Sequence, residues 1–310
     1  MIPTMTSATA IVVSYETRDL LARCLGALRR ERVEAIVVDN ASKDDSVVLV
    51  REQFPEVALF ALERNVGFGA ACNVGASAAD TPYILVLNPD TEPRAGAVEA
   101  LVASCSASDT IAGATPRVVD ERGRESTSVL RYPSRWWRGA PPTTSVRGIW
   151  PRRPTTKRGT LEGEYAIGAA LLLRRDAFLQ IGGFDPGFFL YYEEVDLCRR
   201  LQAAGWSIER CPEAEVVHVG GAATRTQWSI AYRQQLRGHL RYIGKHEGRR
   251  AAVTSRLVLL VAVLLRYVLS RGDRRAGYKA GLAWLATVDL DSVAAPGPAP
   301  GPANGLASRQ

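Results

Sequence analysis

The sequence predicts an α/β fold with a mostly parallel central sheet flanked by helices. Short apolar, β-branched segments recur near the N-terminus, each ends at or just before a polar residue, and helical spacing of apolar residues fills the gaps. These segments span 10–14, 35–38, 57–62 and 83–87. Strands that alternate with helices form parallel sheets, whose ligands bind at the carboxyl ends of the strands. The polar residues expected at those ends are Ser14, Asp39, Asn65 and Asp90.

The composition is that of a soluble globular protein with a basic surface. Hydrophobic residues make up 46% of the 310-residue chain and charged residues 23%, so a core of normal size can form. The net charge of +7 indicates an anionic partner, which by charge alone is a nucleic acid, a phosphorylated substrate or an acidic lipid surface. Arginines concentrate beside the apolar C-terminal segment, which favours a membrane over a nucleic acid.

The cysteines and the N-terminus indicate a reducing, cytoplasmic compartment. The five cysteines are odd in number and scattered, and none forms a CxxC pair, which argues against a disulfide framework or a structural zinc site. The first eight residues lack a basic region followed by an apolar one, so we expect no signal peptide and a cytoplasmic catalytic face.

Four regions are expected along the chain. Residues 1–8 form a disordered N-terminus, and residues 9–248 form the catalytic domain. Basic and apolar helices associated with a membrane follow at 249–290, and the Pro/Gly/Ala-rich residues 291–310 form a disordered tail. Within the catalytic domain, the segment 130–163 is rich in Pro, Arg, Trp and Thr and is expected to be a mobile loop over the site.

The segment 256–270 is strongly apolar apart from Arg256 and Arg266. The stretch between these arginines is about half of the roughly 20 residues that a membrane-spanning helix needs. We therefore expect a helix that lies on or in the membrane interface, where the neighbouring basic side chains suit anionic headgroups. The alternative is a solvated basic face on a helix whose apolar side is buried in protein.

Asp39 follows an apolar strand in the run Val38-Asp39-Asn40-Ala41-Ser42. A carboxylate held at this point can accept a hydrogen bond from the imide N–H of a nucleobase. The alternative is a helix N-cap, since Asp, Asn and Ser are all favourable there.

A glycine-rich turn, Asn65-Val-Gly67-Phe-Gly69, leads into a helix that contains Asn73 and Gly75. Glycines allow a backbone to approach a ligand closely, and a helix N-terminus favours phosphate oxygens. The turn has neither the Gly-Lys-Ser/Thr of a Walker loop nor the G-x-G-x-x-G of a dinucleotide site.

Asp90 lies in Asn88-Pro89-Asp90-Thr91, directly after a strand, at the carboxyl edge of the sheet. Mg²⁺ and Mn²⁺ need few protein carboxylates when a diphosphate and water complete the coordination shell, so one aspartate is sufficient here. His218 ends a later strand-like run and is a candidate second ligand. The alternatives are a Pro-Asp turn and a structural histidine.

Three carboxylates stand at the start of a predicted helix, in Glu193-Glu194-Val195-Asp196. Acidic groups in a first helical turn complement the helix dipole, which is the structural alternative. Three such groups also repel one another, so at least one should have a raised pKa, as a general base requires. Asp196 can pair with Arg199 or Arg200 along the helix, so we expect it to be structural.

Taken in chain order, these motifs resemble those of family 2 glycosyltransferases, over about 10–224. Gly182-Gly-Phe-Asp185 and His218-x-Gly220 complete the set. The resemblance implies a GT-A fold and inverting transfer of a sugar from a nucleotide-diphosphate donor. Within the family, the chain looks most like bacterial rhamnosyltransferases that extend polyprenyl-diphosphate-linked glycans, which implies dTDP-rhamnose as donor and work at the inner face of the cell membrane, without nucleic acid.

The resemblance also implies roles for single residues. Those that hold the donor are Ser14, Tyr15, Asp39, Asn40, Asn65, Gly67, Asn73, Asn88 and Asp90. Asp90 and His218 would hold Mg²⁺ or Mn²⁺, and Asn88 stands where many relatives have a second aspartate. The catalytic base maps to Glu194, beside Glu193 and with Asp196 in reserve. Gly168 and Ala169 would contact the acceptor.

Two other functions fit parts of the pattern. A sugar-1-phosphate nucleotidylyltransferase also binds nucleotides on an α/β sheet, but the residues 14–18 after the first strand lack the Gly-rich loop with Arg and Lys that such enzymes carry. A catalytically degenerate domain could bind a nucleotide sugar or recruit a partner to the membrane. Release of nucleoside diphosphate only in the presence of donor, acceptor and metal would separate the transferase from this second alternative.

Overall fold

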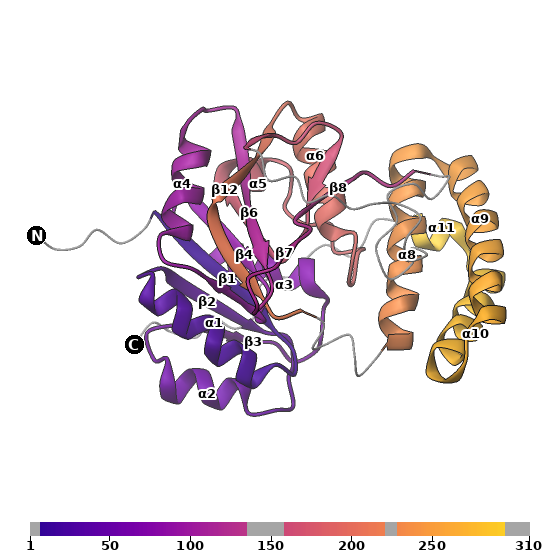
Figure 1. The fold of residues 1–310 in the computed structure, drawn as a ribbon, viewed down its shortest axis with the longest axis horizontal. Coiled ribbons are helices and arrows are strands. Elements are labelled where there is room, and N and C mark those ends of the chain that lie inside the picture. The colour runs from indigo at the N-terminus through magenta and orange to yellow at the C-terminus, as the bar shows by residue number, and fades with distance from the viewer. Residues whose placement is uncertain (1–6, 135–157, 221–227, 295–310) are drawn as a thin grey trace, which may run out of the picture.

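The computed structural model describes residues 7–134, 158–220 and 228–294. Figure 1 shows an α/β part around a central sheet and, beside it, a group of helices from the C-terminal end of the chain. The ten-stranded sheet has the strand order β3-β2-β1-β4-β11-β6-β12-β5, with β7 and β9 paired at its side.

The four strands expected from the sequence form the parallel half of the sheet. They are β1 (Ala8–Ser14), β2 (Glu34–Asp39), β3 (Ala58–Ala61) and β4 (Tyr83–Leu87). Ser14 and Asp39 lie opposite each other in the register, so the ends of β1 and β2 meet. Every residue of β1 is buried, which explains its unbroken apolar sequence.

The other half makes the sheet mixed rather than parallel throughout. β11 (Ala170–Arg174) runs antiparallel to both β4 and β6 (Ile111–Val119). β12 (Ser207–His218) runs parallel to β6, and the short β5 (Thr91–Pro93) pairs antiparallel with the end of β12. This last pairing sets His218 opposite Thr91, next to Asp90.

Short strands complete the α/β part within and beside the segment expected to be a loop. They are β7 (Glu125–Ser126), β8 (Val129–Arg131), β9 (Gly159–Thr160) and β10 (Glu164–Ala166), of which β8 and β10 pair with each other. The expected loop at 130–163 therefore contains strand residues at both ends, and its portion 135–157 lies outside the described residues.

Helices cover both faces of the sheet. One apolar core lies between the sheet and α1 (Arg18–Arg30), α2 (Ser46–Gln53) and α4 (Ala97–Ser106). The other core contains α3 (Phe68–Ala78), α5 (Arg175–Gln180) and α6 (Glu193–Ala203) and continues into the C-terminal helices. Gly205 follows α6 with φ of 89°, as expected for a glycine that ends a helix. All five cysteines are buried free thiols.

The C-terminal helices pack against one another and onto the second core (Figure 1). They are α8 (Trp228–Glu247), α9 (Arg249–Leu269), α10 (Gly272–Thr287) and α11 (Leu290–Ala294). The disordered tail that was expected from residue 291 overlaps α11, which extends to Ala294. The Val293 side chain is buried there, and its carbonyl accepts a hydrogen bond of 2.8 Å from Arg241. Residues 1–6 and 295–310, where disorder was expected, lie outside the described ranges.

The helix expected at 256–270 is longer than the apolar stretch indicated. α9 runs for 21 residues, and Arg256 does not interrupt it, because its guanidinium donates to the Leu285 and Ala286 carbonyls at the end of α10, both at 2.6 Å. Within the described ranges, α9 is the one helix whose length and composition would allow it to cross a membrane.

Gly75 of α3 is expected to be intolerant of a larger side chain. A Cβ there would lie 2.6 Å from Ile11 Cγ2 in the middle of β1, so Gly75→Ala should lower the free energy of unfolding by about 1–3 kcal/mol. The matched control is Gly26→Ala in α1, where a Cβ meets nothing closer than Arg30 Nη1 at 3.7 Å, and stability should stay equal or rise by up to about 1 kcal/mol. Urea denaturation measures both, and equal stabilities would contradict this packing.

Candidate active site

Asp39 is buried at the end of β2 and keeps one carboxylate oxygen unused. Its Oδ2 accepts a hydrogen bond of 3.0 Å from the Ser42 N–H, whereas Oδ1 has no hydrogen-bond partner among the described residues. The N-cap of α2 is Asp45, so Asp39 is not the helix cap that the sequence allowed. A buried carboxylate oxygen without a partner is suited to accept a hydrogen bond from a ligand N–H.

The loops after β1 and β2 are held together around Asp39. Glu16, which has φ of 56°, donates its N–H to Ser42 Oγ at 3.1 Å and accepts the Lys43 N–H at 2.9 Å. The Ser14 hydroxyl is buried and bonded to Thr17 Oγ1 at 3.0 Å, and the Tyr15 ring is exposed. Tyr15 is therefore free to stack on a base, whereas Ser14 shapes the turn.

Hydrogen bonds within the chain occupy the side of the site that contains Asn40, Asn65 and Gly67. Asn40 accepts the Val66 N–H at 2.8 Å and donates to Asn65 Oδ1 at 3.0 Å, and Asn65 Oδ1 also accepts the Gly67 N–H at 2.9 Å. Gly67 has φ of 90°, and a Cβ there would lie 2.4 Å from the Phe189 carbonyl oxygen. The close approach that requires this glycine is to the segment before α6, not to a phosphate.

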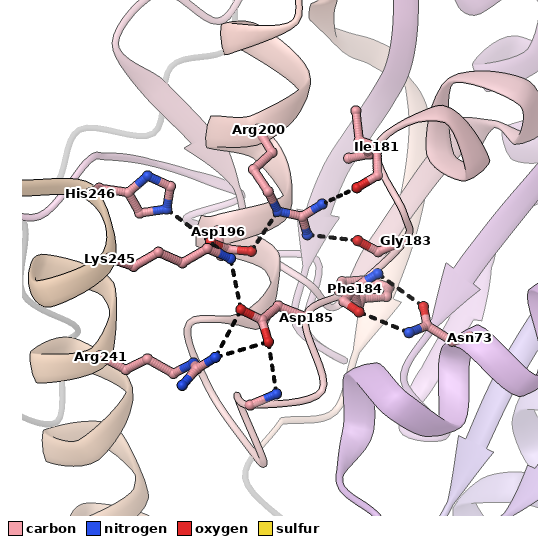
Figure 2. A network of polar contacts seen from close by, with 11 residues as sticks. Asn73, Ile181, Gly183, Phe184, Asp185, Asp196, Arg200, Arg241, Lys245 and His246 are labelled. Atoms are coloured by element: carbon pink, nitrogen blue, oxygen red, sulfur yellow. Dashed lines mark hydrogen bonds and ion pairs between the residues drawn. The ribbon is translucent and has the colours of Figure 1, made fainter. Parts of the chain in front are cut away.

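Asn73 has a different role from the one expected. Its side-chain amide donates to the Phe184 carbonyl at 2.8 Å and accepts the Phe184 N–H at 2.9 Å, as Figure 2 shows. These two bonds fasten the Gly182-Gly-Phe-Asp185 segment to α3. A Cβ at Gly183 would lie 2.6 Å from Asn73 Oδ1, so that glycine makes the contact possible.

Asp90 and His218 meet at the edge of the sheet, as the sequence analysis anticipated. His218 Nε2 lies 3.2 Å from Asp90 Oδ1, and the Val219 N–H donates to the Asp90 carbonyl at 3.0 Å. No group of three or more His, Cys, Asp or Glu side chains suited to a metal occurs in the described parts of the chain. A cation at this pair would have two protein ligands and would need oxygens from a diphosphate and water.

Glu193 and Glu194 open α6, after two tyrosines in a strained conformation. Tyr191 and Tyr192 have φ of 67° and 74°, a region that costs a non-glycine residue about 1–3 kcal/mol. Each glutamate has one buried carboxylate oxygen, Oε2, that no described residue hydrogen-bonds. Such strain and unmet hydrogen-bonding capacity concentrate at functional sites.

The pKa values of both glutamates are raised. Burial raises the pKa of Glu194 to about 7, although interactions with the backbone at the start of α6 oppose the rise. Burial and the charge of Glu194 raise the pKa of Glu193 well above its usual range. A carboxylate whose pKa lies near neutrality is suited to act as a general base, which favours Glu194 over Glu193.

The turn between β10 and β11 connects the Asp90 loop with Glu194. β10 ends at Ala166 and β11 begins at Ala170, and a Cβ at Gly168, between them, would lie 3.4 Å from Glu194 Cβ. The next residue, Ala169, accepts the Asn88 N–H through its carbonyl at 3.0 Å. The metal-binding candidate and the candidate base thus border the same turn.

Asp196 is the structural member of the acidic cluster, as expected. It is fully buried and lies 2.7 Å from Arg200 Nε, 2.8 Å from Lys245 Nζ and 2.8 Å from His246 Nε2. Burial alone would raise the pKa of Asp196, but the hydrogen bond from His246 and the charges of Arg200 and Lys245 outweigh it and hold the pKa well below its ordinary value. It cannot serve as a reserve base, because its oxygens are committed to cations.

Residues of α8 complete this network, and the sequence did not predict their part in it. Asp185 accepts hydrogen bonds from Arg241 at 3.0 Å and from Lys245 at 2.7 Å (Figure 2). The pairing of Asp196 with Arg200 could be read from their spacing on one helix. The α8 partners lie 50 to 60 residues further along the chain, and no local pattern indicates them.

Known proteins are similar to this chain in sequence and in fold. The model of "Glycosyl transferase family 2" matches residues 9–182, and that of "N-terminal domain of galactosyltransferase" matches residues 155–220. The N-acetylglucosaminyl-diphospho-decaprenol L-rhamnosyltransferase of Mycobacterium tuberculosis is 33% identical over 231 residues, 67% of this chain and 74% of that protein. The low-salt glycan biosynthesis hexosyltransferase Agl10 of Haloferax volcanii is 24% identical over 248 residues, 76% and 74% of the two chains.

Among solved structures, the mannosyltransferase PcManGT from Pyrobaculum calidifontis, in complex with GDP-Man and Mn²⁺, matches with a TM-score of 0.53 at 16% identity. The match covers 94% of this chain and 87% of that one, and it shows a shared fold. The family match covers more than half of the chain and agrees with the rhamnosyltransferase relative. The chain therefore belongs to glycosyl transferase family 2 and is a glycosyltransferase with a GT-A fold.

Proposed function

We propose that the protein transfers rhamnose from dTDP-rhamnose, with inversion, to a polyprenyl-diphosphate-linked glycan in the synthesis of a cell-surface polysaccharide. The observation that carries the proposal is the turn at Gly168 and Ala169, which borders both Glu194 and the Asp90 loop. The choice of sugar and acceptor is supported by the Mycobacterium tuberculosis relative, whose name gives rhamnose and a diphospho-decaprenol glycan.

In this proposal Asp39 and Tyr15 hold the nucleoside. The unpaired Asp39 Oδ1 accepts the imide N–H that thymine and uracil both carry, and the exposed Tyr15 ring covers the base. Asp90 and His218 would hold Mg²⁺ or Mn²⁺, which supplies positive charge to the departing diphosphate when bound. Asn88, two residues before Asp90, is uncharged, so the donor diphosphate must provide the remaining negative charge around the cation.

Glu194 acts as the base. Its ionised carboxylate accepts the proton of the acceptor hydroxyl while that oxygen bonds to the anomeric carbon, and the bond from this carbon to the diphosphate breaks. Attack from the face opposite the leaving group inverts the configuration without a covalent intermediate. Gly168 leaves room beside Glu194 for the acceptor, since a side chain there would touch the carboxylate arm.

The proposal includes binding to the inner face of the cell membrane through α9. Several aliphatic side chains of this helix are exposed, and they recur at helical spacing along one side: Val253, Leu257, Val261, Leu264, Leu265, Val268 and Leu269. Leu257, Val258, Val261, Ala262 and Leu265 form a continuous aliphatic patch on this side of α9. Exposed basic side chains stand at the ends of α9 and along α10, at Arg249, Arg250, Arg271, Arg274, Arg275 and Lys279. An apolar face bordered by positive charge fits an anionic lipid surface.

Assay of donor turnover tests the function directly. With a short polyprenyl-diphosphate-linked N-acetylglucosamine acceptor and Mn²⁺ or Mg²⁺, dTDP-rhamnose should yield nucleoside diphosphate and an inverted rhamnoside, and UDP- and GDP-sugars should yield less. EDTA or Asp90→Ala should reduce the rate by roughly 100-fold or more, because the diphosphate then leaves without charge stabilisation. A rate that is independent of metal would refute the role of Asp90 and His218.

Glu194→Gln should reduce kcat by roughly 10²- to 10⁴-fold, which is the usual contribution of a general base. The wild-type kcat should fall as the pH drops below about 7, because protonation of Glu194 removes the base. The matched control is Glu99→Gln, an exposed glutamate in the first turn of α4, which should leave kcat unchanged. Near-normal turnover by folded Glu194→Gln would remove the assignment.

Replacing exposed aliphatic residues of α9 with glutamate should weaken membrane binding. Leu257→Glu with Leu265→Glu should lower the fraction that floats with anionic phospholipid vesicles at least about tenfold, because each change removes aliphatic area from the lipid contact. The control pair Val48→Glu with Leu179→Glu changes exposed aliphatic residues outside α9 and should float like the wild type. Equal losses in both pairs would contradict a specific role for α9.

A further inference from the structure

The strained turn before the base is held by helix α8. A Cβ at Gly238 of α8 would lie 2.7 Å from the Tyr191 carbonyl oxygen and 2.9 Å from Tyr192 Cδ2, so the glycine lets the helix backbone press against the turn. The rings of Tyr192 and Tyr242 also pack together, with centroids 6.1 Å apart. The positive φ of both turn residues is thus enforced from α8, which begins more than 30 residues after them.

A buried chain of hydrogen bonds leads from this turn into α9. The Tyr192 hydroxyl is 2.9 Å from His239 Nδ1, and His239 Nε2 is 2.8 Å from Ser255 Oγ. All three side chains are buried. Burial lowers the pKa of His239 to about 4, so the ring is neutral at physiological pH, with one nitrogen that donates and one that accepts.

Tyr192 also connects to the base through the backbone. It is the N-cap residue of α6, and its carbonyl accepts the Asp196 N–H at 2.9 Å, so the helical turn that contains Glu194 starts from it. A displacement of Tyr192 therefore displaces the Glu194 carboxylate. The hydroxyl of Tyr192 is held by α8, and its backbone begins the turn that carries Glu194.

The same helix fixes both ends of the segment that carries the base. Lys245 bridges Asp185, ahead of the turn, at 2.7 Å and Asp196, one turn into α6, at 2.8 Å. Figure 2 shows these carboxylates facing α8. The segment 185–196 is therefore anchored to α8 at its start, at Tyr192 and at its end.

We propose that Tyr192 and His239 are positioning residues for the catalytic base, because the chain from Ser255 through His239 and the Tyr192 hydroxyl fixes the N-cap of the helical turn that carries Glu194. The inference rests on the proposed role of Glu194 as base. It assigns α8 and α9 a function beyond contact with a membrane, because these helices hold the backbone that carries the catalytic base.

Tyr192→Phe tests the inference, because it removes the hydroxyl and keeps the ring. We expect kcat to fall roughly 10- to 100-fold and the KM for the donor to stay unchanged. The acidic limb of the kcat–pH profile should move to higher pH, because a carboxylate displaced from the start of α6 loses backbone interactions that favour its ionised form. The titratable groups that face Glu194 are Glu193, Tyr191, Tyr192 and Cys198. Burial raises the pKa of the tyrosines and of Cys198, the latter to about 12, so the limb reports on the glutamate pair.

Tyr232→Phe is the matched control. Tyr232 is a buried tyrosine of α8 whose hydroxyl has no hydrogen-bond partner in the described parts of the chain, and it packs on Trp228 and Tyr278, not on the turn. Its loss should change neither kcat nor the pH profile. Equal losses of kcat and equal shifts of the pH profile in Tyr192→Phe and Tyr232→Phe would indicate a general need for buried tyrosines in this core and would overturn the inference.

A pair of substitutions at His239 gives a second, independent measurement. In His239→Asn the amide replaces Nδ1 and keeps a partner for Tyr192, whereas in His239→Gln the amide replaces Nε2 and keeps only the Ser255 side. We expect His239→Asn to retain most of the wild-type kcat and His239→Gln to match Tyr192→Phe in kcat and pH profile. Equal activity of the two His239 variants would contradict the relay.

The inference and the proposed function fail in different ways. Full activity of Glu194→Gln would remove the proposed function. An inactive Glu194→Gln together with a Tyr192→Phe enzyme of unchanged kcat and unchanged acidic limb would leave the function standing and overturn the positioning role.

Discussion

The active site depends on one short backbone turn between β10, which pairs with β8 in a small two-stranded sheet, and β11 of the main sheet. β10 ends at Ala166 and β11 begins at Ala170, so residues 167–169 join the two sheets. The Ala169 carbonyl accepts the Asn88 N–H, and a Cβ at Gly168 would lie 3.4 Å from Glu194 Cβ. The turn therefore borders both the loop that carries Asp90 and the helical turn that carries Glu194.

Much of the fold and part of the site follow from local sequence patterns. The strands β1, β2 and β4 could be predicted because almost all of their residues are buried and apolar, and Asp39 and Asp90 follow from their places at strand ends. The meeting of Asp90 with His218 was anticipated from chain order, and the pairing of β5 with β12 produces it. Asp196 could be recognised as structural because Arg200 is four residues further along the helix.

Contacts between distant segments could not be predicted in the same way. Asn73 carries the amide that a ligand site would also use, and only the fold shows that Phe184 occupies it. Gly67 is required by Phe189, which lies more than 100 residues away. The length of α9 was underestimated because a charged residue inside an apolar run normally ends a membrane helix, whereas the Arg256 guanidinium reaches the end of α10.

The contact between Gly67 and Phe189 joins two segments that lie far apart in the sequence. The Phe68 N–H donates to the Phe189 carbonyl at 3.0 Å, so the glycine-rich turn and the chain leading to Glu194 are linked through the backbone. Asn40, directly after β2, holds the same turn by accepting the Val66 N–H at 2.8 Å. The loop after Asp39 therefore restrains the chain that leads to Glu194.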